Sequence, residues 1–122
     1  MTKIEAYISQ FEGEQLHILE YFHSLFTEWG LMPKIRFKVP FYFQHSWIVY
    51  LNPVKNEGIE LAFLRANELQ NPYLDMKDRK QVGGITFYKY SEIKKEVIDL
   101  IIQEALLLDE SVPYSVKKKN KR

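Results

Sequence analysis

Hydrophobic residues recur at helical spacing in the first 30 positions. Thr2 and Glu5 have the spacing of a helix-capping box, and apolar residues follow at intervals of three or four. A second helix is predicted from about residue 14 to 29, with Gly30 suited to its C-terminal cap. The apolar face of this second helix would consist of Ile18, Phe22, Leu25, Phe26 and Trp29.

Between residues 34 and 65 the spacing changes to that of strands, and β-branched and aromatic residues become frequent. Turn residues at 44–46 and 56–58 divide this region, and Pro40 indicates an edge strand or a bend. The predicted strands cover residues 36–39, 41–43, 47–51, 59–65 and 82–88. Because short turns join neighbouring strands, we expect antiparallel pairing.

The last third of the chain predicts a long loop, a strand and a helix. The loop, residues 66–81, has a length that is often functional. Two glycines at positions 83 and 84 predict a bulge or a close approach of backbone or ligand. The helix is predicted to begin at the cap Ser91, and its inner face would consist of Ile93, Val97, Leu100, Ile101 and Leu108. Ile102 and Leu106 lie outside this stripe, so we expect the helix to be covered on two sides or to form a homodimer interface.

Helices before and after a central antiparallel sheet predict an α+β fold of two layers. We expect a sheet of four to five strands, packed by two N-terminal helices and one C-terminal helix. The length of 122 residues fits one domain, which we assign to residues 1–114. Residues 115–122 would form a basic, disordered tail.

The net charge of +1 hides an uneven distribution. Residues 117–122 hold five of the 17 basic residues, so the rest of the chain has 12 basic and 16 acidic residues, a net charge of −4. An acidic body disfavours a nucleic-acid partner. The sequence has no signal segment and no apolar run of membrane-spanning length, so we expect a cytoplasmic protein without membrane contact. The absence of cysteine excludes disulfides, cysteine-ligated zinc and thiol nucleophiles.

One candidate metal site lies on the second predicted helix. Glu14, His17, Glu20 and His23 supply imidazole and carboxylate groups, which suit iron or zinc. The two histidines diverge by about 120° in helical projection, and the set lies opposite the apolar face. A solvated helix face accounts for the same residues.

Basic and aromatic residues of the sheet and long loop form a second candidate set. The residues chosen as a ligand groove are Arg36, Tyr42, Trp47, Arg65 and Arg79. Arginine side chains bind carboxylate or phosphate in bidentate fashion, and Trp or Tyr stacks on planar ligands. By strand alternation Arg65 should share a face with Ile59, Leu61 and Phe63, and it would then need Glu60, Glu68 or a ligand as partner. A plain core with strand-edge cations explains the set equally simply.

No catalytic motif stands out. His45 lies alone in a polar turn, without a serine or threonine in a recognisable nucleophile motif. We therefore assign no catalytic residue and do not expect an enzyme.

Four segments resemble the YdhG-like family, the domain of unknown function 1801. They are residues 37–42 (FKVPFY), 46–51 (SWIVYL), 60–63 (ELAF) and 79–85 (RKQVGGI), within a resemblance that extends over residues 4–108. Val39 stands where the family often has methionine before the proline. The resemblance implies an α+β domain without an assigned activity, and one branch of the family is described as a frataxin-like iron chaperone.

Two functional hypotheses follow. The first is a non-enzymatic domain that binds a small anionic or planar ligand, or a protein, in a groove beside the sheet, without a required cofactor. The alternative is an iron-binding chaperone that uses the carboxylates and histidines of the second helix.

Overall fold

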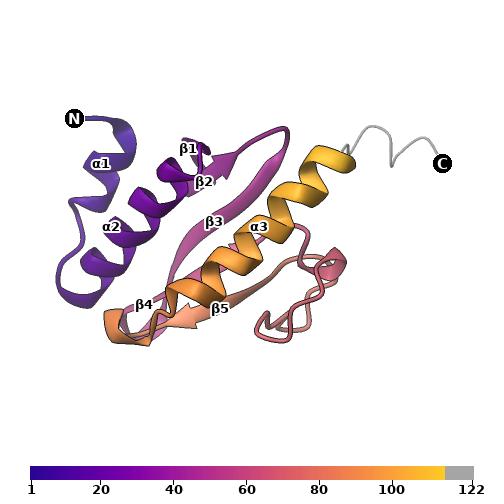
Figure 1. The fold of residues 1–122 in the computed structure, drawn as a ribbon. Helices are drawn as coiled ribbons and strands as arrows, with labels where there is room; N and C mark the ends of the chain where they lie inside the picture. The colour runs from indigo at the N-terminus through magenta and orange to yellow at the C-terminus, as the bar shows by residue number, and fades with distance from the viewer. Residues whose placement is uncertain (115–122) are drawn as a thin grey trace.

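A five-stranded antiparallel sheet forms the centre of the protein, and a computed structural model describes it together with the rest of residues 1–114 (Figure 1). The strands are β1 (Met32–Arg36), β2 (Val39–Phe43), β3 (Trp47–Val54), β4 (Gly58–Phe63) and β5 (Gly83–Phe87). Their order in the sheet is the order in the chain, so each strand pairs with the next. The predicted α+β fold class is confirmed. The predicted tail, residues 115–122, lies outside the described residues.

Three helices cover one face of the sheet, as Figure 1 shows. They are α1 (Lys3–Ile8), α2 (Gly13–Glu28) and α3 (Lys95–Ser111). The capping box at Thr2 and Glu5 is present at the start of α1. The core between helices and sheet includes Ile18, Phe22, Phe26, Tyr42, Leu51, Leu61, Phe63 and Ile101. Within residues 1–114, no helix is long and apolar enough to cross a membrane.

The turn between β1 and β2 differs from the prediction. Phe37 and Lys38 were expected within a strand, but they form a hairpin turn with φ angles of +49° and +69°. Two-residue hairpin turns with positive φ usually contain glycine or asparagine, and neither is present here. The alternation of apolar and basic residues at 36–39 therefore reflects a turn flanked by two strand ends, with the Phe37 side chain exposed.

A β-bulge in β3 determines which side chains face away from the helices. Phe43 pairs with Trp47 and Tyr42 pairs with Val49, so Ile48 is the additional residue. Ile48 and Val49 both enter the core. Because a bulge reverses the alternation of the strand, Trp47 and Tyr50 lie together on the face that the helices leave open.

The last helix begins later and lies in a different rotation than the sequence pattern predicts. A short 3₁₀ turn at Tyr90–Glu92 precedes it, so Ser91 is not its cap. Its buried residues are Ile98, Ile101, Ile102, Ala105, Leu106 and Asp109. Leu100, predicted to face inward, is 64% exposed. A homodimer through this helix stays a prediction, with Leu100 and Leu107 as its exposed apolar residues.

The close approach predicted for the paired glycines is confirmed at Gly84. A Cβ at this position would overlap with the carbonyl oxygen of Leu61 on β4. On its other side, Gly84 exchanges two main-chain hydrogen bonds with Asp75 of the long loop, 2.8 and 3.0 Å long. Gly84 thereby holds the loop against the edge of the sheet.

Candidate ligand site on the sheet

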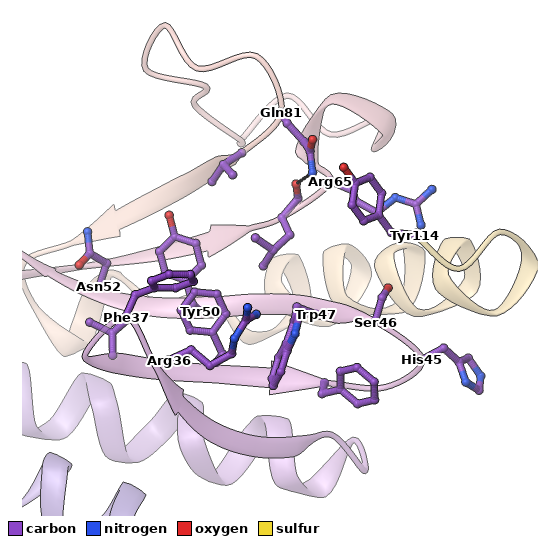
Figure 2. Close-up of a pocket in the computed structure, with 15 residues that line it drawn as sticks. Arg36, Phe37, His45, Ser46, Trp47, Tyr50, Asn52, Arg65, Gln81 and Tyr114 are labelled. Atoms are coloured by element: carbon purple, nitrogen blue, oxygen red, sulfur yellow. Dashed lines mark hydrogen bonds between the residues drawn. The ribbon is translucent and has the colours of Figure 1, made fainter. Parts of the chain in front are cut away.

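The open face of the sheet contains a cavity of about 710 Å³, which we call the sheet-face groove (Figure 2). Strands β1 to β3, the two residues after β4, the end of the long loop and the segment after α3 contribute to it. Its lining residues are Arg36, Phe37, Val39, Phe41, Phe43, His45, Ser46, Trp47, Tyr50, Asn52, Leu64, Arg65, Gln81, Val82 and Tyr114. None of them is acidic, and two are arginines.

Aromatic rings form the floor of the groove. Phe41 and Tyr50, paired across β2 and β3, stack with ring centroids 4.7 Å apart and planes 19° apart. Trp47 meets Phe41 nearly at right angles, with centroids 5.9 Å apart. Stacked and edge-to-face contacts are the arrangements that aromatic quadrupoles favour. The result is an aromatic cluster in which Phe41 and Tyr50 are stacked and the indole of Trp47 stands across Phe41.

Arg36 lies over these rings. Its guanidinium carbon is 4.3 Å from the centroid of Trp47, 5.1 Å from Phe41 and 5.2 Å from Phe37. Such distances are those of cation–π contacts, which each contribute roughly 0.5 to 2 kcal/mol. In the described part of the chain, the ion pairs do not include Arg36. Its charge faces the groove without a carboxylate beside it.

Arg65 stands at the far end of the groove, past the end of β4, and is 9% exposed. Its Nε and Nη2 donate to the two carboxylate oxygens of Glu68 at 2.8 Å, and Nη1 donates to the carbonyl of Val112 at 2.5 Å. These hydrogen bonds to Glu68 raise the pKa of the guanidinium. Of the partners predicted for Arg65, Glu68 is therefore the observed one. Arg65 also reaches the space between the sheet and α3, so strand alternation alone does not describe its position.

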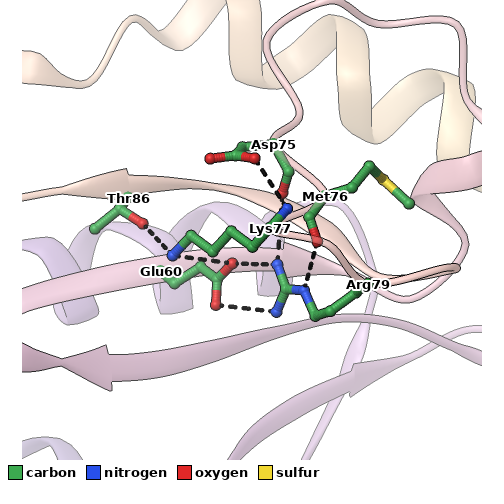
Figure 3. Close-up of polar contacts among 6 residues, drawn as sticks. All are labelled: Glu60, Asp75, Met76, Lys77, Arg79 and Thr86. Carbon is green, nitrogen blue, oxygen red and sulfur yellow. Dashed lines mark hydrogen bonds and ion pairs between the residues drawn. The ribbon is translucent and has the colours of Figure 1, made fainter.

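Arg79 does not line the groove, although its charge acts on the lining residue Tyr50. Figure 3 shows Arg79 paired with Glu60. Its Nη2 donates to Glu60 at 2.6 Å, and Lys77 Nζ lies 3.6 Å from the same carboxylate oxygen. Glu60 is 2% exposed, on β4 beneath the long loop. Burial and Glu60 raise the pKa of the nearby Tyr50, while Arg79 opposes them. The Tyr50 hydroxyl is therefore neutral near pH 7.

Tyr42 lies on the opposite face from the groove, which corrects its assignment to the ligand set. It is fully buried against α2, where its hydroxyl shares a 2.9 Å hydrogen bond with His23 Nδ1. Phe41 and Phe43, its neighbours in β2, point into the groove instead. Alternation along β2 contained this signal, because the residues on either side of a buried Tyr42 must face the other way.

The structure thus brings Arg36, Trp47 and Arg65 together on one surface, as the groove hypothesis requires. Sequence reasoning missed several lining residues that are ordinary strand residues, among them Tyr50, Asn52 and Leu64. It also missed Gln81, whose amide donates to the Leu64 carbonyl at 2.8 Å. No local motif marks such residues, since only pairing of the strands places them side by side.

The residue types of a catalytic triad meet at the β2–β3 turn, where His45 and Ser46 of the turn lie against Asp109 of α3. Their arrangement differs from that of a triad. Asp109 of α3 accepts hydrogen bonds from the Ser46 hydroxyl and from the main-chain N–H of His45, at 2.7 Å for the latter. In a triad the imidazole stands between the serine and the acid. Here the carboxylate binds the serine directly, so the contact fastens the turn to the helix.

The four residues of the metal hypothesis do not converge on one point, although His17 and Glu20 line one shallow surface pocket. Glu14 accepts a hydrogen bond from the Tyr90 main chain at 2.6 Å, and the ring of His17 meets Tyr90 edge-on. His23 is bonded to Tyr42, and Glu20 is exposed. Among residues 1–114, no three His, Cys, Asp or Glu side chains are grouped so that they could hold a metal ion. The iron-chaperone hypothesis stays a prediction that no contact among these residues favours.

His23 makes stability depend on pH. Burial lowers its pKa below the ordinary 6.5, with Glu5 opposing. The unfolded chain therefore takes up a proton at a higher pH than the folded protein, so the free energy of unfolding decreases as the pH falls below about 6.5. We expect His23→Gln to weaken this decrease, measured by chemical denaturation at about pH 7.5 and about pH 5.5. The exposed His17→Gln is the control and should keep the native dependence. An unchanged dependence in His23→Gln would contradict the assignment.

Comparison with known proteins provides no relative for this chain: no family model, no curated protein and no solved structure matches it. The resemblance to the YdhG-like family therefore stays a prediction from the four segments that suggested it.

Proposed function

We propose that the protein is a non-enzymatic binding domain for a small anionic or planar ligand, held in the sheet-face groove. The observation that supports this most directly is Arg36, whose guanidinium lies over the rings of Trp47 and Phe41 and makes no ion pair with a carboxylate of residues 1–114. A cation that lines a groove without acidic lining residues attracts a negative group.

The size and composition of the groove agree with this proposal. Small-molecule sites usually measure roughly 300 to 1,000 Å³ and combine apolar walls with a few placed polar groups. Here the walls are aromatic and aliphatic, and the polar groups include Arg36, Asn52 and Gln81. Because the helices bury their own faces against the far side of the sheet, the strands leave this surface available as a rigid platform.

Two tryptophans make the proposal testable by nuclear magnetic resonance. The chain contains Trp47 in the groove and Trp29 at the end of α2, so the spectrum should show two indole N–H signals. We expect a panel of flat and anionic probes, beginning with 2-naphthoate, to shift the Trp47 signal. The Trp29 signal serves as an internal control and is assigned by its loss in Trp29→Phe. A panel of flat anions, flat neutral compounds and compact anions that leaves Trp47 unmoved would overturn the proposal.

A further inference from the structure

We infer that the groove is built for a planar monocarboxylate, whose carboxylate pairs with Arg36 while its ring packs against the aromatic side chains of Phe41, Trp47 and Tyr50. This inference rests on the proposed function and specifies its ligand class. Three observations carry it: the orientation of Arg36, the number of uncompensated charges and the shape of the floor.

Arg36 has the geometry of a carboxylate receptor. A guanidinium whose carbon lies 4.3 Å from a ring centroid lies over that ring, so its hydrogen-bond donors project from the edges of the planar group. Two parallel N–H groups of arginine match the two oxygens of a carboxylate. The rings of Trp47, Phe41 and Phe37 surround the group on the protein side and lower the exposure of the pair to water.

The charge balance favours one negative charge. The groove has two arginines, but Arg65 is already paired with Glu68 through two hydrogen bonds. Among the described arginines that line the groove, Arg36 is therefore the one left for a ligand. A dianion such as a phosphate ester would bring a second charge into an apolar groove without a partner, which is unfavourable. The Tyr50 hydroxyl is neutral near pH 7 because burial and Glu60 raise its pKa, so it adds no repulsion.

The floor favours a flat body over a bulky one. Phe41 and Tyr50 are stacked, with ring planes 19° from parallel, and Leu64 and Val82 also line the groove. An aromatic ring of the ligand that continues this stack gains stacking contacts in addition to the burial of its apolar area. A saturated ring of the same size gains burial alone.

The test compares four probes by isothermal titration with the whole chain. They are 2-naphthoate, its neutral amide 2-naphthamide, its saturated counterpart decahydro-2-naphthoate and inorganic phosphate. We expect 2-naphthoate to bind at least about tenfold more tightly than each of the others, as one charge-assisted bidentate contact implies. Arg36→Gln should weaken 2-naphthoate about tenfold and leave 2-naphthamide unchanged.

Lys34→Gln is the matched control, because Lys34 stands two residues earlier on the same strand and does not line the groove. It should bind 2-naphthoate like the native protein. Arg36→Lys keeps the charge without the bidentate geometry and should lose part of the affinity. Native circular dichroism of each variant separates lost binding from lost folding.

The outcomes distinguish this inference from the proposal beneath it. Two results would overturn the pairing of a ligand carboxylate with Arg36. They are equal binding of 2-naphthamide and 2-naphthoate, and unchanged 2-naphthoate binding in Arg36→Gln. Equal binding of decahydro-2-naphthoate overturns the requirement for a planar body. Tighter binding of phosphate overturns the preference for a single negative charge. In each case the groove still binds a ligand. Failure of every probe, together with an unmoved Trp47 signal, removes the proposed function as well.

Discussion

Replacing Asp109 with alanine is expected to lower the free energy of unfolding by about 4 kcal/mol, because three donors lose their acceptor in a buried place. Asp109 is 1% exposed near the end of α3. It accepts from the Gln44 amide at 3.0 Å, from the His45 main chain at 2.7 Å and from the Ser46 hydroxyl. Hydrogen bonds to a charged acceptor contribute about 1.5 to 3 kcal/mol each, and an unsatisfied buried donor costs a similar amount.

Urea denaturation followed by circular dichroism measures this effect. Glu110→Ala, the exposed neighbour on the same helix turn, is the control and should change stability by less than about 0.5 kcal/mol. Asp109→Asn should lose less than Asp109→Ala, since its amide oxygen keeps part of the acceptor role. A loss below about 1 kcal/mol in Asp109→Ala would show that the turn is not fastened by this carboxylate.

Arg79→Ala is expected to destabilise the protein by about 3 kcal/mol, because it leaves the buried carboxylate of Glu60 without its closest cation. Removing one partner of a buried ion pair typically costs about 3 to 5 kcal/mol. The lower end applies here because Arg79 is 31% exposed and Lys77 stays 3.6 Å from the same oxygen. The substitution also releases the Arg79 Nε bond to the Met76 carbonyl, 3.0 Å long, inside the long loop.

The same denaturation experiment applies, with two comparisons. Lys80→Ala, exposed and adjacent in the chain, should have almost no effect, and Lys77→Ala should cost less than about 1 kcal/mol because Lys77 is 41% exposed. The double variant Glu60→Gln with Arg79→Ala should lose less unfolding free energy than the two single variants lose in sum. Both charges of the pair are then removed, so no unpaired buried charge is left. Additive losses would mean that Arg79 and Glu60 do not stabilise each other.

The buried face of a helix could be predicted from the sequence where the apolar residues lie along one side only. In α2 the apolar residues keep one helical face, and four of the five residues predicted on it are buried. In α3 the apolar residues are too numerous to define one face, and the rotation was predicted wrongly. Leu100 fits the apolar stripe as well as Ile102 does, and only contact with the sheet distinguishes them.

The groove could be predicted in part. Arg36, Trp47 and Arg65 were predicted to share it, and they do so. Tyr42 was predicted in the groove because of its aromatic ring. Strand alternation instead places it on the face opposite to Phe41 and Phe43. Arg79 was assigned to the groove itself, whereas it does not line the groove and pairs with the buried Glu60.

The α+β class, the approximate strands and the aromatic and basic character of the central segment follow from the amino-acid pattern alone. These properties depend on neighbours within a few residues, through periodicity, capping and turn preferences. The bulge at Ile48, the hairpin turn at Phe37 and Lys38, and the pairing of Arg65 with Glu68 became visible in the folded protein. The bulge and the turn depend on strand register. Because Glu68 pairs with Arg65, Arg36 is the groove arginine that is left for a ligand. The groove consequently exists only after folding, because its floor, its cation and its far end come from separate strands that the sheet aligns.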